Sequence, residues 1–265
     1  MITSKRLSIA IATYNEEQFI GQCLDSVATI ADEIILVDGH SSDKTTTIAK
    51  QHKNVKVFET TNKSMFHLNK QMAIDHCSGT WILQLDADEI VSNSLQKEID
   101  QLINRDPKDI PENGFWVNRA NFFLTKFLKK GGQYPDRTLR LYKNGKGRLP
   151  CNSVHEQAVV EGKVGYLTSD LLHYADASFS RYLFRNDRYT TLIAEDLANN
   201  HLNANTLNFI NYFFIKPPAW FIKTYFRHKG FQDGFPGFVF SWYSSLRFPL
   251  AFIKYYELIH KSKTI

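Results

Sequence analysis

Short apolar runs alternate with helix-length segments from the start of the chain to about residue 105. Parallel strands need a crossover between them, which is usually a helix, so this alternation is typical of βαβ units. A run that is apolar throughout between its end residues, as in Glu33–Asp38, indicates a strand that is covered on both faces. The sequence therefore predicts an α/β fold with a mainly parallel, Rossmann-like sheet. The strands that we expect are Leu7–Tyr14, Glu33–Asp38, Val55–Thr60 and Trp81–Asp86.

Polar residues that can cap helices follow three of these strands. The oxygen of an Asn or Ser side chain can accept a hydrogen bond from a first-turn N–H, and such residues therefore mark helix starts. We expect helices to begin after Asn15, Ser42 and Ser92, and a further helix from about Phe66 to His76. The helix after Ser92 is expected to turn Leu95, Ile99 and Leu102 toward the core and to stop before Pro107.

The alternation weakens beyond Pro111, where the strand-like pieces Gly114–Asn118 and Thr138–Lys143 lie among Gly, Pro and basic residues. This section is expected to complete the sheet. From about Phe179 onward the pattern becomes helical and then rich in aromatic residues. We therefore expect one domain over 1–178, with halves at 1–105 and 106–178, and a helical C-terminal region over 179–265.

The C-terminal region is basic and aromatic. From Asn203 to Ile265 there are eight Lys or Arg residues against Asp233 and Glu257, a net charge of +6, which leaves the remainder close to neutral. The same stretch holds 18 of the 36 aromatic residues. No apolar run in it reaches the ~20 residues that a spanning helix needs. Such helices suit the headgroup layer of an anionic membrane. The alternatives are a subunit interface, as in a homodimer, and an ordinary packed helical cap.

Three cysteines, Cys23, Cys77 and Cys151, lie far apart and form no C-x-x-C pair, so we interpret them as reduced thiols. No charged-then-apolar leader precedes the first strand. Both features favour a cytoplasmic protein, which together with the basic aromatic tail suggests a peripheral position on the cytoplasmic face of the inner membrane.

Polar side chains gather where the predicted parallel strands end: Asn15, Asp38, and the D-x-D pair Asp86 and Asp88. Ligands of open α/β sheets bind at this edge. Two close carboxylates repel each other unless a cation is present, and Mg²⁺ or Mn²⁺ accepts one or two carboxylates together with substrate phosphate. The pattern therefore suggests a divalent metal and a diphosphate substrate. The alternative is an acidic turn that merely caps the helix after Ser92.

Three segments in order, "SIAIATYNEEQFIGQCLDSV", "DEIILVDGHSSDKT" and "GTWILQLDADE", resemble the amino-terminal half of family 2 glycosyltransferases. The resemblance implies a GT-A (nucleotide-diphospho-sugar transferase) fold, in which 1–105 is the nucleotide-binding half and 106–178 the acceptor half. "GGQYPDRTLRLYKNGKGRL" and "SVHEQ" are similar to the bacterial subgroup that adds glucose to the heptose inner core of lipopolysaccharide. A UDP-sugar donor and a glycan or lipid-linked glycan acceptor are implied.

The resemblance also implies residue roles on the donor side. Asp38 would accept a hydrogen bond from the uracil N–H, Asp86 would approach the ribose and the metal, and Asp88 would bind the metal and hold the β-phosphate. Asn69 would lie near the nucleotide with Lys70 beside it, although a solvated helix face is the other interpretation of Lys70. The residues expected beside the base are Thr13, Tyr14, Asn15 and Glu17.

An inverting transferase needs one carboxylate to take the acceptor proton. The family's usual Glu-Asp pair is absent, and "VHEQ" stands about where it is expected, so Glu156 is the first candidate base and Asp136 the second. His155 would complete the metal shell or orient the acceptor, or is a structural histidine. One of the two arginines that follow Asp136, Arg137 or Arg140, is expected to reach the diphosphate or an anionic acceptor, and the other to lie at the surface.

Other function classes fit less well. A nucleotidyltransferase needs a glycine-rich phosphate loop after the first strand, and "ATYNEEQFI" has none. Nucleic-acid binding is disfavoured because the acidic crevice would repel a phosphate backbone. A non-catalytic, membrane-associated sugar-nucleotide-binding protein remains the main alternative to an inverting hexosyltransferase.

Overall fold

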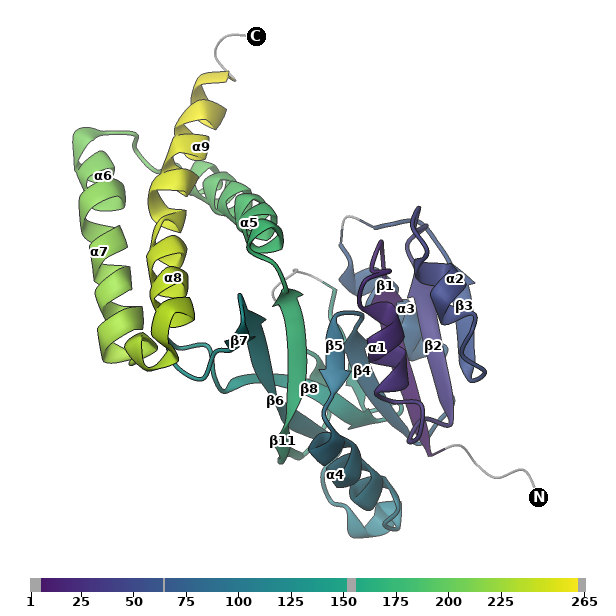
Figure 1. Ribbon diagram of the computed structural model, residues 1–265. Coiled ribbons are helices and arrows are strands. Elements are labelled where there is room, and N and C mark those ends of the chain that lie inside the picture. Colours follow the sequence, from purple (N-terminus) through teal and green to yellow (C-terminus); the bar gives the residue numbers. More distant parts are fainter. Residues whose placement is uncertain (1–5, 64, 152–155, 262–265) are drawn as a thin grey trace. The chain divides into compact units, whose positions relative to one another are not determined.

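A computed structural model describes residues 6–63, 65–151 and 156–261 (Figure 1). The chain forms two compact units. The first comprises the residues up to Arg119 together with Asp136–His173, and the second comprises Ala120–Pro135 together with the chain from Tyr174 onward. The helical unit therefore takes a segment from the middle of the predicted acceptor half. This segment belongs with the helices because the buried carboxylate of Asp233 accepts hydrogen bonds from the backbone N–H groups of Lys129 and Lys130.

The predicted parallel sheet is confirmed. β1 (Leu7–Thr13), β2 (Glu33–Asp38), β3 (Val55–Glu59) and β4 (Trp81–Asp86) pair in parallel in the order β3-β2-β1-β4. The sheet continues beyond β4 with β8, β6, β11 and β5, and the pairings recorded there are antiparallel. These strands are β8 (Asp136–Lys143), β6 (Gly114–Phe123), β11 (Val164–Asp176) and β5 (Glu89–Val91); β7 (Lys126–Phe127) pairs with β6, and β9 (Gly147–Arg148) pairs with β10 (Val159–Val160).

Both faces of β1, β2 and β4 are buried, which explains why these strands are mostly apolar, whereas the edge strand β3 is half-buried to exposed. On one face, Ile9 and Leu36 belong to a cluster that includes residues of α1 (Ile20–Asp25) and α4 (Asn93–Ile103). On the other face, side chains of β1, β2 and β4 pack with α3 (His67–Asp75). The short α2 (Thr45–Ala49) follows β2, and a 3₁₀ turn, Pro107–Asp109, follows α4.

Two of the three predicted helix caps are wrong. α1 begins only at Ile20, because Asn15 adopts a positive φ of 55° and its side-chain oxygen accepts from the backbone N–H of Ser42 instead. The N–H of Ser42 thus links the loop after β2 to the loop after β1. Ser42 does not cap α2, which begins at Thr45. Asn tolerates this backbone conformation better than most residues. The Ser92 cap is confirmed by its bond from the N–H of Leu95. In the helix that it opens, Leu95 and Ile99 are buried as expected, with Ile103 rather than Leu102 as the next buried residue.

The sequence analysis missed β5 and β11. β5 is only three residues long and lies directly after the D-x-D pair, whereas β11 mixes polar and apolar residues without a continuous apolar run. These strands pair antiparallel, with Glu89 opposite His173 and Ile90 opposite Leu172. Their pairing places a histidine beside the acidic turn that follows β4.

The second unit is mostly helical, as expected from Phe179 onward. α5 (Phe179–Asn199) is followed by a helical hairpin of two long arms, which Figure 1 shows side by side. The first arm runs through α6 (Thr206–Ile210), a π segment (Asn211–Ile215), α7 (Lys216–Phe221) and a second π segment (Ile222–Arg227); a 3₁₀ turn (Gly230–Asp233) leads to α8 (Gly234–Ser245) and α9 (Arg247–Lys261). None of the described helices has the length and apolar character needed to cross a membrane.

Candidate active site

The predicted polar edge of the sheet is present, because β1, β2 and β4 end side by side. Thr13 lies opposite Asp38, and Ala12 lies opposite Asp86. Asp38 is buried, and its carboxylate accepts hydrogen bonds from the N–H of Ser41 at 2.7 Å and from the Ser41 hydroxyl at 2.6 Å. The turn after β2 therefore holds Asp38 in one orientation.

Asn15 and Glu17 connect the loops that follow β1 and β2. The Asn15 side chain accepts from the N–H of Ser42, and a Glu17 oxygen accepts from the N–H of Lys44 at 2.9 Å. Tyr14, between them, is 45% exposed. The hydroxyl of Thr13 is buried and has no hydrogen-bond partner within the described chain. Buried hydroxyls are normally paired, so this group marks a place where a polar ligand is expected.

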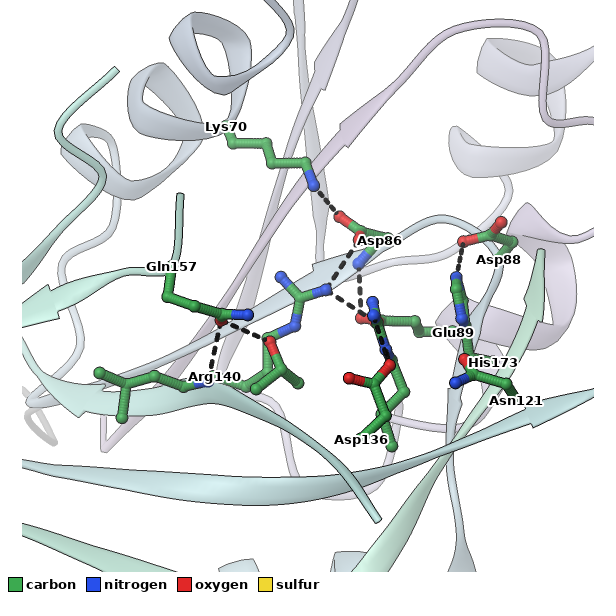
Figure 2. A network of polar contacts seen from close by, with 12 residues as sticks. Lys70, Asp86, Asp88, Glu89, Asn121, Asp136, Arg140, Gln157 and His173 are labelled. Carbon is green, nitrogen blue, oxygen red and sulfur yellow. Dashed lines mark hydrogen bonds and ion pairs between the residues drawn. The ribbon is translucent and has the colours of Figure 1, made fainter. Parts of the chain in front are cut away.

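Asp86 is neutralised by two cations from different elements (Figure 2). Lys70, on α3, forms an ion pair with one carboxylate oxygen, and the Arg140 guanidinium, on β8, lies 2.7 Å from the other. Burial alone would raise the pKa of Asp86, but Arg140 and Lys70 hold that pKa well below its ordinary value. Lys70 therefore belongs to the site and not to a solvated helix face, the alternative that the sequence left open.

Glu89 organises the charges behind Asp86, and the sequence analysis gave it no role. It is fully buried; one of its oxygens accepts from the N–H of Asp86 at 3.0 Å, and the other lies 2.7 Å from Arg140. Arg119, on β6, is 3.5 Å from the same Glu89 oxygen. Burial opposes the charge on Arg140, but Asp86 and Glu89 raise its pKa further above the ordinary value. The arginine is therefore a permanent cation of the site.

The two arginines that follow Asp136 separate as strand alternation requires. Arg140 is buried at the site, whereas Arg137 is exposed, with its guanidinium 5.0 Å from the centre of the Tyr166 ring. The carboxylate of Asp136 accepts from Arg119 through both Nε, at 2.9 Å, and Nη2, at 2.7 Å. Asp136 is thus an ion-pair partner at the edge of the network.

Asp88, the second carboxylate of the D-x-D pair, faces His173 rather than the arginines. The His173 Nε2 lies 3.7 Å from an Asp88 oxygen (Figure 2). Burial lowers the pKa of His173, which keeps its imidazole neutral near neutral pH, and a neutral imidazole can bind a metal. A carboxylate and an imidazole fit Mn²⁺ or Mg²⁺, which fills its other positions with water and phosphate. Within residues 6–63, 65–151 and 156–261, no three His, Cys, Asp or Glu side chains gather as a metal site.

The structure describes two further predicted residues, Asn69 and Glu156. Asn69 is buried, and its amide donates to the backbone oxygen of Thr61, so it holds the loop after β3. Glu156 is half-buried. Gln157, next to it, accepts from the Thr138 hydroxyl at 3.0 Å, which attaches this segment to β8. His155 lies outside the described residues.

The half-buried D-x-D turn lies at the edge of a parallel sheet, which is where ligands of α/β proteins bind. The family model "Glycosyl transferase family 2" matches residues 8–160, which is more than half of the chain. The chain belongs to glycosyl transferase family 2, and its fold is the GT-A fold, as the sequence predicted.

Relatives of known sequence match nearly the whole chain. The lipopolysaccharide core biosynthesis glycosyltransferase LpsC of Rhizobium meliloti is 28% identical over 246 residues, which cover 90% of this chain and 87% of LpsC. An uncharacterized glycosyltransferase of Rickettsia typhi is 28% identical over 280 residues, covering 98% and 90% of the two chains. The Pyrobaculum calidifontis mannosyltransferase PcManGT, solved with GDP-Man and Mn²⁺, has a similar fold with a TM-score of 0.52 and 14% identity, covering 96% and 88%.

Proposed function

We propose that the protein is an inverting hexosyltransferase that moves glucose from UDP-glucose to a cell-surface glycan such as the lipopolysaccharide inner core, with Mg²⁺ or Mn²⁺ bound. The observation that carries the proposal is the pairing of Asp88 with a neutral His173 at the end of β4, in a chain of this family. The name of the Rhizobium meliloti relative supports the choice of acceptor.

The metal would be held by Asp88 and His173, whereas Asp86 is already paired with Lys70 and Arg140. Bound there, a divalent cation would neutralise negative charge that develops on the leaving diphosphate. In this proposal His173 completes the metal shell, a role for which His155, outside the described residues, is the other candidate. Lys70 and Arg140, which pair with Asp86, have a second role in this proposal. Both would lie close to the diphosphate, and each could give up part of its contact with the Asp86 carboxylate to bind phosphate oxygens.

The nucleoside would lie over the ends of β1 and β2. The carboxylate of Asp38, oriented by Ser41, would accept the uracil N–H, and the unpaired hydroxyl of Thr13 would bond to the base or ribose. Asn15 and Glu17 would act by holding the two loops together, since their side-chain oxygens already accept backbone N–H groups. The exposed ring of Tyr14 is available to stack on the base.

We propose Glu156 as the base that takes the proton of the acceptor hydroxyl. Asp136 is the weaker candidate, because Arg119 donates two hydrogen bonds to one of its oxygens and so stabilises its charged, weakly basic form. Glu156→Gln should keep donor binding and lower transfer by about 10²–10⁴-fold. Calorimetry with UDP and a transfer assay measure the two effects, with Asp136→Asn as the comparison; a fully active Glu156→Gln enzyme would move the assignment to Asp136.

The proposed function is tested most directly by a donor panel. Purified protein is incubated with UDP-glucose, UDP-galactose, UDP-GlcNAc and GDP-mannose, with Mn²⁺ or with EDTA, and released nucleotide is measured by mass spectrometry. We expect UDP release from UDP-glucose that EDTA abolishes and Mn²⁺ restores. Folded protein that neither binds nor hydrolyses any donor with Mn²⁺ present would instead favour a non-catalytic scaffold.

A lipid-linked acceptor would bring the enzyme to the cytoplasmic face of the inner membrane, where we propose that it is peripherally bound.

A further inference from the structure

The first arm of the helical hairpin, residues 206–227, is apolar on its exposed side as well as on its buried side. Along the arm, large apolar residues with exposed fractions between 41% and 76% lie three or four positions apart, except for a gap of eight positions between Phe214 and Ile222. Tyr212, Pro217 and Thr224 are buried on the opposite side. A helix that is hydrophobic all round does not normally face water. The exposed residues are Leu207, Ile210, Phe214, Ile222 and Phe226.

The second arm continues this surface. Phe235 on α8 is 72% exposed and Trp242 is 49% exposed. The Phe221 ring contacts the rings of Phe238 and Trp242 across the hairpin, with centroids 6.0 Å apart in both pairs, so the exposed residues of the two arms adjoin. An exposed apolar area of this extent marks an interaction surface on a folded protein.

Exposed cations surround the turn between the arms. Arg227 is the last residue of the first arm, Lys229 directly precedes the turn, and Lys129 and Lys130 come from the segment Ala120–Pro135. Asp233 is the only acidic residue in segments 120–135 and 205–256. Its carboxylate is buried, accepts the N–H groups of Lys129 and Lys130, and lies 3.6 Å from the Nζ of Lys126, a neighbouring lysine that is not counted among these four cations.

Close backbone packing builds this turn. The N–H of Gly131 donates to the oxygen of His228 at 2.9 Å, which attaches the lysine segment to the hairpin. A Cβ on Gly237 would lie 2.0 Å from the backbone oxygen of Gly230, so only glycine allows α8 to approach the turn this closely. The lysines and the aromatic rings are therefore held together by specific contacts.

We infer that this surface docks on an anionic membrane. We call it the docking face, and its members are Leu207, Ile210, Phe214, Ile222, Phe226, Phe235, Phe238 and Trp242, with the cations Lys129, Lys130, Arg227 and Lys229. Its apolar side chains enter the headgroup layer while the cations bind lipid phosphates. The inference rests on the proposed function, because a lipid-linked acceptor is part of that proposal. It adds the surface by which the enzyme would meet the membrane.

Charge decides between a membrane and a second copy of the chain. A two-fold interface uses the same patch on both subunits. Two docking faces would bring four cations on each side together without an exposed acidic residue to pair them, whereas lipid phosphates complement those cations along the whole face. The observations therefore favour the lipid surface.

Sedimentation with vesicles tests the inference, with protein and no substrate. We expect binding to phosphatidylglycerol–phosphatidylcholine vesicles, release in high salt, and little binding to phosphatidylcholine alone. Lys129→Gln combined with Lys130→Gln should weaken binding about tenfold or more, because the bonds from these residues to Asp233 are made by backbone N–H groups and survive. Phe214→Ser combined with Phe235→Ser should weaken it similarly.

Matched controls are Phe184→Ser, at a 79% exposed ring on α5, and Lys97→Gln, at an exposed lysine on α4. Both should leave vesicle binding unchanged. Equal binding to both vesicle types, or equal loss in the controls, would overturn the inference. So would a concentration-dependent dimer, seen by light scattering, that the Phe214/Phe235 variant loses while vesicles bind neither protein. Donor hydrolysis measured without vesicles reports separately on the proposed function.

Discussion

At the scale of single residues, the site depends on which cation pairs with which carboxylate. Asp86 and Glu89 share Arg140, and Asp88 is left to face His173. The D-x-D motif thus divides its two carboxylates between different tasks. The first is balanced by protein cations, and the second lies beside His173, where we propose that a metal binds.

Glu89 should be important for folding as well as for the site. Replacing Glu89 with Gln leaves Arg140 and Arg119 without their shared buried counter-charge, and breaking such a buried pair costs about 3 kcal/mol or more. Glu59→Gln is the matched control, because its ion pair with Lys50 is on the surface and contributes less than about 1 kcal/mol. Urea unfolding of both variants measures the difference, and equal losses would contradict the structural role of Glu89.

His173 should determine metal affinity. His173→Ala should raise the Mn²⁺ concentration needed for half-maximal donor hydrolysis by at least about tenfold, because loss of a direct ligand should cost at least as much as loss of a supporting residue. Asp88→Ala should abolish metal-dependent turnover. In both variants urea unfolding checks the fold, and His52→Ala, near the surface residue Asp25, serves as control. An unchanged Mn²⁺ requirement in His173→Ala would refute the metal role.

At the scale of elements, the antiparallel pairing of β5 with β11 delivers His173 to the acidic turn. α4 supports that arrangement through Glu98, whose carboxylate accepts from the N–H groups of Thr168 at 2.8 Å and Ser169 at 2.9 Å. Burial alone would raise the pKa of Glu98, but these bonds hold that pKa below its ordinary value of 4.5. The charged form of Glu98 is therefore favoured in the folded protein.

This lowered pKa gives a defined pH dependence. A group whose pKa is lower in the folded state stabilises the protein above its unfolded pKa, and the stabilisation disappears as the pH falls through the folded pKa. Glu98→Gln should therefore cost about 1 kcal/mol at neutral pH, a modest value because the side chain is only half-buried, and nearly nothing in acid. Urea unfolding of wild type and variant from neutral to acid pH measures the difference in their free energies of unfolding. A difference that does not change with pH would contradict the prediction.

At the scale of the whole molecule, the chain divides its chemistry between two compact units. The first contains the acidic turn with Asp86 and Asp88, where we propose that the donor binds, and the second contains the proposed docking face. The sequence already indicated this division through the net charge of +6 after Asn203. It did not indicate that Ala120–Pro135 belongs with the helices, because that association depends on bonds from Lys129 and Lys130 to Asp233, about a hundred residues away in the chain.

The sequence by itself determined the parallel strands and the positions of Asp38, Asp86 and Asp88 at their ends. A strand that is buried on both faces appears in the sequence as a short apolar run, and the end of the run marks the end of the strand. Only the tertiary structure decided the roles of Glu89 and His173. Their positions follow from the pairing of β5 with β11, whose partners are eighty or more residues apart, and no local period encodes such pairing. A distant contact also explains why Asn15 does not cap α1. Its side-chain oxygen accepts a hydrogen bond from the N–H of Ser42, in the loop after β2.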